Sequence, residues 1–252
     1  MTYSPDVREE DEIATPPAPG RPVAVVMAGG RGQRLRPLTD KVPKPLLRIG
    51  GTPIIERIIA SLADAGIEDV YLSVNYKAEA FEERLGDGEH LGVRITYLRE
   101  REALGTAGSL SMLPPEIDQP ILVMNADIMT RMSFAELIAF HQGHGDAATV
   151  AAIEYTAVVP YAVLRTDDTR LQAIEEKPRQ PSLCNAGIYV IEPRVLPLVP
   201  AGSPLDMPDL LQKAMAEGHV VRVYATAEKW FDIGSPEDFE RVLIEFATGE
   251  EE

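Results

Sequence analysis

The chain has 252 residues, 45% of them hydrophobic and 25% charged, which is ordinary for a globular protein and excludes collagen, a coiled coil and wholesale disorder. Its net charge of −16 argues against a nucleic-acid partner, and its single cysteine, Cys184, excludes a disulfide framework or a cysteine-based metal cluster within one chain. No apolar run approaches the roughly 18 residues that a membrane span requires, and the acidic, proline-rich N-terminus is unlike a signal peptide, so we expect a cytoplasmic protein with no membrane partner.

The sequence predicts one domain between two tails. Residues 1–20 are acidic and proline-rich and are predicted to be a flexible tail, residues 21–248 a single domain, and residues 249–252 a second acidic tail. The domain opens with the apolar run Val23–Met27, which suits a strand buried on both faces. Thr52-Pro53 is predicted to start a helix, with the threonine as N-cap and the proline as the first helical residue.

Strand and helix patterns then alternate along the chain. Ser133 and Glu136 form a capping-box pattern that predicts a helix ending at about His141. The alternation predicts an α/β fold with a Rossmann-like, doubly wound, mainly parallel sheet and helices on both faces. The other predicted strands are 70–74, 93–98, 121–124, 147–153, 161–165, 171–176, 186–191 and 220–225, and the other predicted helices are 77–85, 105–113, 206–217 and the segment after Pro236.

A glycine-rich, basic loop follows the first strand. Segment Ala28–Pro37 has three glycines within four residues, which let the backbone approach a ligand closely and offer N–H groups to phosphate oxygens. The window Gly29–Arg48 carries six basic residues and one acid, and Arg34 and Lys44 are suited to neutralise a polyphosphate. The loop is neither a P-loop, which needs a Gly-Lys-Ser/Thr, nor a GxGxxG fingerprint, because Leu35 stands at the third glycine.

Two aspartates follow apolar runs at places where strands are predicted to end. Asp127 lies just beyond Ile121–Met124, and Asp232 follows Trp230-Phe231. Taken alone, each is more typical of a turn or a helix cap. Together, at the same sheet edge as a phosphate loop, they predict a magnesium site, since Mg²⁺ is bound by one or two carboxylates plus phosphate oxygens.

The remaining polar clusters carry weaker signals. The segment Glu175–Pro178 by itself reads as a solvated strand end. His141 and His144 have no third ligand nearby and are predicted to lie at a solvated helix end, while Cys184 is predicted to be an inert small residue. No Ser-His-Asp arrangement is apparent.

The string Val26–Thr39, continuing to Val42–Leu46, resembles the signature of the sugar-1-phosphate nucleotidylyltransferases. Further matching segments follow in the family's order, and together they cover about residues 22–245. The chain is most similar to the short bacterial mannose-1-phosphate and heptose-1-phosphate guanylyltransferases. These segments are Leu104–Gly108, Asn125–Asp127, Glu175–Pro178, Asn185–Tyr189 and Trp230–Gly234.

This resemblance implies a nucleoside triphosphate and a sugar 1-phosphate as substrates and Mg²⁺ as cofactor. It implies catalytic roles for Arg34, Lys44, Asp127, Lys177 and Asp232, with Asp127 and Asp232 as the metal ligands. It implies nucleotide-binding roles for Ala28, Gly29, Gly30, Gly32, Gln33, Gly105, Thr106 and Asn125. It implies sugar-phosphate-binding roles for Tyr161, Glu176, Asn185, Ala186 and Gly187, with the Lys177 side chain on the sugar's phosphate.

Three positions depart from the family's pattern. Gln33 replaces the usual threonine of the loop, Ala126 replaces the common glycine before the metal-binding aspartate, and Ala162 stands where many relatives have glycine. The resemblance implies that Gln33 touches the triphosphate and that Ala126 and Ala162 narrow the pocket. None of them removes a charged group that the chemistry needs.

The implied reaction accounts for the absence of a nucleophilic side chain. The nucleophile is an already ionised oxygen of the sugar phosphate, which attacks the nucleotide α-phosphorus in line while pyrophosphate leaves, so the site must chiefly position and neutralise charge. A guanylyltransferase is favoured by Leu104–Gly108, with a thymidylyl- or uridylyltransferase as the alternative. A non-catalytic subunit that binds sugar nucleotides is the alternative from another functional class. A dehydrogenase-type dinucleotide domain is disfavoured by the broken GxGxxG pattern and the arginine-rich loop. The sequence is compatible with a homodimer but does not determine the oligomeric state.

Overall fold

The computed structural model describes residues 20–247, so both predicted tails, apart from Gly20, lie outside the described residues. Their predicted flexibility therefore stays a prediction. Within residues 20–247, no helix combines the length and the apolar character needed to cross a membrane.

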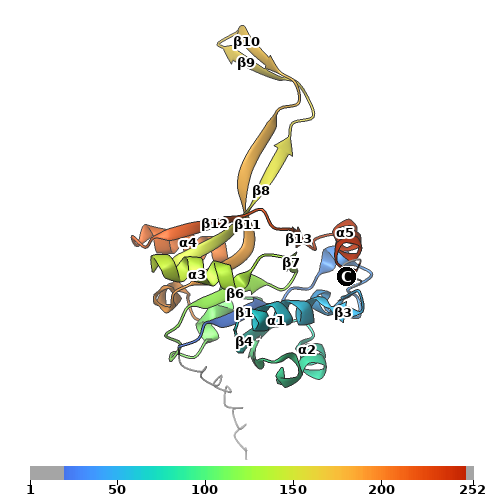
Figure 1. The fold of residues 1–252 in the computed structure, drawn as a ribbon, viewed down its shortest axis with the longest axis vertical. Coiled ribbons are helices and arrows are strands. Elements are labelled where there is room, and N and C mark those ends of the chain that lie inside the picture. The colour runs from blue at the N-terminus through green and yellow to red at the C-terminus, as the bar shows by residue number, and fades with distance from the viewer. Residues whose placement is uncertain (1–19, 248–252) are drawn as a thin grey trace, which may run out of the picture.

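A seven-stranded sheet forms the centre of the molecule (Figure 1). Its strand order is β12-β8-β11-β6-β1-β4-β5, and β11 alone among these seven runs antiparallel to its neighbours. The predicted doubly wound, mainly parallel sheet is therefore confirmed. The strands of this sheet are β1 (Val23–Met27), β4 (Asp69–Val74), β5 (Arg94–Arg99), β6 (Ile121–Asn125), β8 (Ala148–Val158), β11 (Arg179–Ile191) and β12 (Val221–Thr226).

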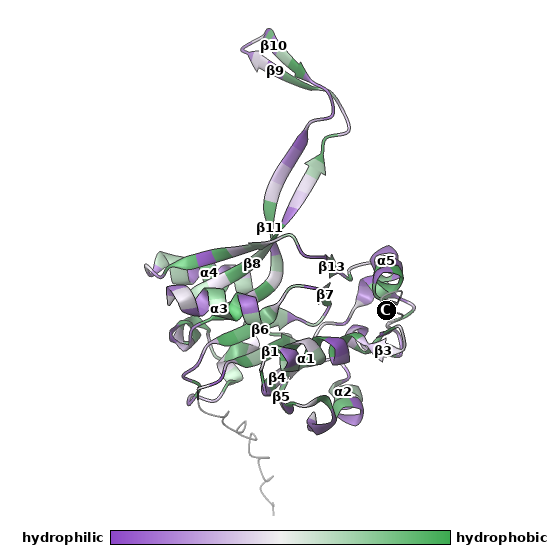
Figure 2. Ribbon diagram, in the orientation of Figure 1, coloured by the Kyte–Doolittle hydropathy of each residue, from purple (hydrophilic) through white to green (hydrophobic). Residues whose placement is uncertain are grey.

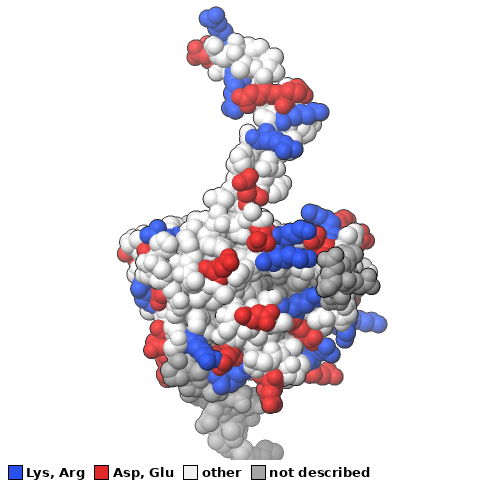
Figure 3. Space-filling view, viewed as in Figure 1, with Lys and Arg blue, Asp and Glu red and all other residues white. Residues whose placement is uncertain are grey.

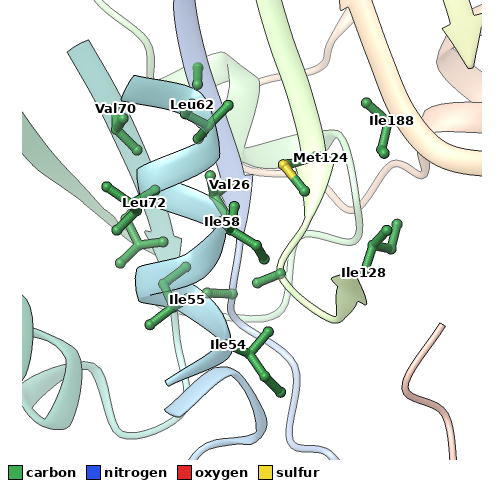
Figure 4. Packing of buried hydrophobic residues seen from close by; sticks show 14 of the residues in the cluster. Val26, Ile54, Ile55, Ile58, Leu62, Val70, Leu72, Met124, Ile128 and Ile188 are labelled. Atoms are coloured by element: carbon green, nitrogen blue, oxygen red, sulfur yellow. The ribbon is translucent and has the colours of Figure 1, made fainter. Parts of the chain in front are cut away.

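Helices cover both faces of this sheet, because its central strands are apolar on both sides. In β1, Ala24 and Val26 belong to one hydrophobic core, while Val23 and Val25 belong to the core on the opposite face. Figure 4 shows α1 packed against the first face. The first core includes residues of α1 (Ile54–Asp64), α2 (Ala78–Leu85), α3 (Phe134–His144) and α5 (Pro236–Ala247), and the second includes residues of α4 (Met207–Ala216).

Three small two-stranded sheets supplement the main one. The sequence patterns did not indicate four of these six strands, because two or three residues are too few to show a period. The pairing of β7 with β13 matters most here, because it joins the segments that carry Asp127 and Asp232. The pairs are β2 (Arg48–Ile49) with β3 (Thr52–Pro53), β7 (Ile128–Thr130) with β13 (Trp230–Asp232), and β9 (Val163–Asp167) with β10 (Arg170–Glu175).

Three local predictions were wrong. Thr52 pairs in β3 and α1 begins at Ile54, so the threonine is not the N-cap. Residues 105–113 contain only a 3₁₀ helix, Gly108–Met112, because the preceding loop bonds to Leu205 instead of continuing as α-helix. His141 is not solvated: it is fully buried, and its ring nitrogens bond to Thr149 and Glu192.

A long β-ribbon rises from the sheet and ends in the β9–β10 hairpin (Figure 1). It is the outer part of β8 and β11, which stay paired from Ala152 and Asn185 to Val158 and Arg179. We call residues 154–183 the arm, since β8 pairs with β12 only as far as Ile153. Because β8 runs parallel to β1 and β6, the arm leaves the sheet at the edge where those strands end.

Candidate active site

The glycine-rich loop after β1 lines a pocket of about 340 Å³ at the carboxyl edge of the sheet. Gly32 has φ +58°, a left-handed conformation that favours glycine. A Cβ at Gly32 would lie 3.0 Å from the Lys44 side chain and 3.1 Å from that of Thr39, so the loop packs closely on both. The lining residues are Met27, Ala28, Gly30, Gly32, Gln33, Arg34, Leu35, Lys44, Pro45, Asp127 and Gly234.

Lys44 forms the central ion pair of this pocket. Its Nζ donates a hydrogen bond to Asp127 Oδ2 at 2.7 Å, across 83 positions of sequence. Lys44 is only 7% exposed and sits at the start of a short 3₁₀ helix that fixes its backbone, whereas the Asp127 side chain is 33% exposed. The lysine predicted to meet phosphate therefore already contacts an aspartate predicted to bind metal.

Backbone pairing holds Asp127 and Asp232 side by side. The Ile233 N–H donates to the Asp127 carbonyl at 3.0 Å, and Asp232 lies opposite Ile128 in the β7–β13 pair. Partial burial, and next the negative charge of Asp127, raise the pKa of Asp232, while Lys44 and Arg34 act in the opposite direction. The backbone pairing thus brings the two carboxylates near enough for the charge of one to affect the pKa of the other.

This donor set fits a divalent cation. Hard oxygen ligands suit Mg²⁺, which commonly takes one or two carboxylates and completes its shell with substrate phosphates and water. Among residues 20–247, no group of three or more His, Cys, Asp or Glu side chains is arranged to hold a metal. Asp127 and Asp232 would therefore supply two ligands, and phosphate oxygens and water would supply the rest.

Glu100, which the sequence analysis missed, supports the glycine loop from behind. It accepts hydrogen bonds from the Ser73 hydroxyl and, at 2.9 Å, from the Leu104 N–H. A Cβ at Gly29 would lie 3.2 Å from Glu100 Oε1, so Gly29 faces this carboxylate and does not line the pocket. The available signal was positional: Glu100 directly follows β5, at the same sheet edge as Asp127.

The Gly105–Thr106 loop is fastened to the start of α4. The Thr106 N–H donates to Asp206 Oδ1 at 2.9 Å, and the Met207 N–H donates to the Thr106 hydroxyl at 2.9 Å. Gly105 has φ +75°, and a Cβ there would lie 2.6 Å from the Leu205 carbonyl oxygen. The loop is thus rigidly placed but does not line the pocket, and its predicted contact with the base stays a prediction.

The Asn185–Gly187 segment lies beside Asn125 at a bulge of β11. Gly187 has φ +68°, its N–H donates to Asn185 Oδ1 at 2.9 Å, and a Cβ there would lie 2.9 Å from Asn125 Nδ2. Trp230, two residues before Asp232 in β13, donates from its indole to the Ala186 carbonyl at 2.9 Å. The segment predicted to face the sugar is therefore fixed near the turn between β6 and β7, which carries Asp127.

Tyr161, Glu176 and Lys177 lie on the arm instead. They occupy the two connections between the β8–β11 ribbon and the β9–β10 hairpin, which Figure 1 shows well outside the body. All three are exposed, Tyr161 at 75%. The structure does not bring them to the pocket, and their predicted contacts with the sugar phosphate stay predictions.

Two curated relatives are similar to most of this chain. At 34% identity the chain resembles a mannose-1-phosphate guanylyltransferase of Mycobacterium tuberculosis, over 90% of this chain and 65% of that protein. At 35% identity it resembles a mannose-1-phosphate guanyltransferase of Saccharomyces cerevisiae, over 85% of this chain and 62% of that protein. The chain thus spans less than two thirds of the length of these relatives.

Solved structures share the fold. A putative glucose-1-phosphate thymidylyltransferase of Bacillus anthracis superposes with a TM-score of 0.73 at 23% identity, covering 90% of this chain and 96% of that one. HddC of Yersinia pseudotuberculosis superposes with a TM-score of 0.70 at 26% identity, covering 88% and 98%. The sequence model described as nucleotidyl transferase matches residues 23–248, nearly the whole described region, and the chain belongs to this family.

Proposed function

We propose that this protein transfers a nucleotidyl group from a nucleoside triphosphate to a sugar 1-phosphate, forming a nucleoside-diphosphate sugar and pyrophosphate. One observation carries the proposal. Lys44, Arg34 and Asp127 line a single glycine-walled pocket, and the β7–β13 pairing holds Asp232 beside Asp127 at its edge. Together, these two basic groups and two carboxylates are suited to bind a polyphosphate with its cation.

The chain's own groups perform the parts of this reaction that a protein must supply. Backbone N–H groups of the glycine loop, with Arg34 and Lys44, would bind and orient the triphosphate and neutralise charge on it. The sugar phosphate is itself an ionised nucleophile, so catalysis rests on positioning and charge neutralisation, and no protein base is needed. A divalent cation held by Asp127 and Asp232 would neutralise charge that develops on the phosphates.

The Lys44 ammonium group is placed to serve two anionic partners. It donates a hydrogen bond to Asp127 Oδ2 at 2.7 Å. When a triphosphate binds, the same ammonium lies within the pocket wall and is suited to contact a phosphate oxygen.

We propose GTP as the nucleotide and a mannose-type sugar 1-phosphate as the acceptor. This choice is supported by the names of the sequence relatives, which are mannose-1-phosphate guanylyltransferases at 34–35% identity. The Bacillus anthracis neighbour is named as a thymidylyltransferase, and at 23% identity it supports the fold alone. A non-catalytic binding subunit is disfavoured because all charged groups that the reaction needs are present.

A panel assay tests the proposal. Pyrophosphate release is measured with five nucleoside triphosphates crossed with mannose, glucose, galactose and heptose 1-phosphates, all with Mg²⁺. The expected result is turnover with GTP and mannose 1-phosphate that is absent in the matched Asp127→Asn variant. Tight binding of GDP-sugar without turnover of any pair would establish a binding subunit and refute the proposed reaction.

A further inference from the structure

The arm is a two-stranded ribbon without a third strand. Beyond Ile153, β8 pairs only with β11, and β11 begins to pair with β6 only at Ile188. An isolated two-stranded ribbon is marginally stable in water and needs a further strand or a packed face. Within residues 20–247 of one protomer the arm has neither, as Figure 1 shows.

Exposed apolar residues gather on this arm, and Figure 2 colours its hydrophobic segments green. Of the 14 large hydrophobic residues exposed among residues 20–247, seven belong to the arm. Single exposed apolar residues need no explanation, but a concentrated set marks an interaction surface. The seven are Tyr155 (58% exposed), Val158 (53%), Tyr161 (75%), Leu164 (59%), Leu171 (49%), Ile174 (60%) and Leu183 (60%).

At the tip, these residues occupy one face of the hairpin. Leu164 lies directly opposite Ile174, and Leu171 opposite Thr166 on the same face. The other face carries Arg165 paired with Glu175, at 2.9 Å between Nε and Oε1. The β9–β10 hairpin is therefore amphipathic, and its apolar face has no cover within the described chain.

Along the ribbon, apolar side chains point to both faces. Tyr155 shares one face with Ser182, whereas Val158 and Leu183 lie on the opposite face, as the register Glu154–Leu183 and Val158–Arg179 requires. A lid that folded onto its own body would cover one of these faces and leave the other in water. A partner that covers both faces fits the pattern better.

We propose that the arm is a dimerisation element and that a second copy of this chain covers it. Scaled by their exposures, the seven side chains present about 700 Å² per arm, so two arms hide about 1,400 Å² in a two-fold contact. That area lies within the range of stable protein interfaces, about 1,200–2,000 Å². Two-fold dimers, in which the same patch is used twice, are the commonest oligomers.

Charge supports a copy of the arm as the partner. The arm has four basic and five acidic residues, which is nearly neutral in a chain of net charge −16. Figure 3 shows basic and acidic side chains interspersed along it. Arms can therefore meet without the like-charge repulsion that two acidic bodies would experience, and opposite charges can pair across the contact.

The test uses a matched pair of substitutions at neighbouring positions. Ile174→Glu places a carboxylate on the apolar face, and Ala173→Glu places the same charge on the face that carries Arg165. Light scattering at micromolar concentration should give twice the 27.6 kDa chain mass for the unchanged protein and for Ala173→Glu. Ile174→Glu should raise the dimer dissociation constant at least about 10-fold.

Hydrogen exchange on the unchanged protein gives an independent reading that requires no variant. Backbone amides of residues 154–158 and 179–183 should exchange slowly in the dimer and faster on dilution to the monomer. Far-UV circular dichroism establishes that Ile174→Glu remains folded. A monomer at micromolar concentration, or a dimer that Ile174→Glu does not weaken more than Ala173→Glu, would overturn the inference.

Discussion

Replacing Lys44 by alanine isolates the charge at the centre of the pocket. The substitution removes the ammonium group that contacts Asp127 at 2.7 Å and lies in the wall of the phosphate pocket. Loss of a charge-assisted contact with phosphate costs about 1.5–3 kcal/mol, or roughly 10- to 150-fold in kcat/KM for the nucleotide. We expect Lys44→Ala to reduce kcat/KM for GTP by that factor.

The same substitution should affect stability much less. It leaves Asp127 without its partner, but the Asp127 side chain is 33% exposed, so water replaces much of the lost interaction. A cost of about 1 kcal/mol lowers Tm by about 2–4 °C in a domain of this size. At 25 °C the Lys44→Ala variant should therefore remain folded, so that its loss of kcat/KM is measured on native protein.

Arg36→Ala is the matched control. Arg36 belongs to the same basic loop, but its side chain is 63% exposed, pairs with Asp40 at 3.4 Å and does not line the pocket. Pyrophosphate release is measured for both variants with GTP varied at saturating mannose 1-phosphate. Equal losses in the two variants would show that the charge of the loop acts at long range. No loss in Lys44→Ala would show that Lys44 does not contact the nucleotide.

Four further outcomes are expected. Excess chelator should abolish turnover and added Mg²⁺ should restore it; undiminished turnover would remove the metal role from both aspartates. If Lys177 binds the sugar's phosphate, as the family resemblance implies, Lys177→Ala should raise the apparent KM for the sugar phosphate about 10- to 150-fold with the KM for GTP unchanged; an unchanged KM for both substrates would agree with its exposed place on the arm, away from the pocket. Gly187→Ala should lower Tm by several degrees, because φ +68° is left-handed and a Cβ would lie 2.9 Å from Asn125 Nδ2; an unchanged melting curve would contradict the close approach. Burial lowers the pKa of His141 below its usual 6.5, so the unfolded chain takes up the proton first as pH falls and stability decreases below about pH 6.5. Urea unfolding at pH 7.5 and 5.5 should show a smaller decrease in His141→Gln than in the unchanged protein.

Much of the sheet could be predicted from sequence because its strands are continuous apolar runs. Val23–Met27 was predicted at the bounds that the structure gives, and the Ser133 cap accepts the Glu136 N–H as expected. Failures occurred where tertiary contacts decide. The 105–113 segment bonds to Leu205, about a hundred residues away, and no local pattern reveals such a partner.

The sequence indicated which residues form the candidate site, but it did not indicate which of them contact one another. A basic, glycine-rich loop at a strand end indicates phosphate binding by itself, and Arg34 and Lys44 do line the pocket. The ion pair between Lys44 and Asp127 spans 83 positions and was not predictable without the fold. Nor was the burial of His141, because its partners Thr149 and Glu192 come from other elements.

The arm also bears on how the chain can fold. β9 and β10 are joined by a two-residue turn, Asp168-Thr169, with Asp168 in the left-handed conformation that aspartate tolerates. Once this turn forms, the hairpin and then β8 and β11 can pair progressively from the tip toward the sheet. Compared with closing a flexible loop of roughly thirty residues, this zipping lowers the entropic cost of joining the two strands by about 2 kcal/mol. Local contacts in the arm thus bring β11, the antiparallel strand of the main sheet, beside β8. This pairing positions β11 to pair with β6, which lies far from it along the chain.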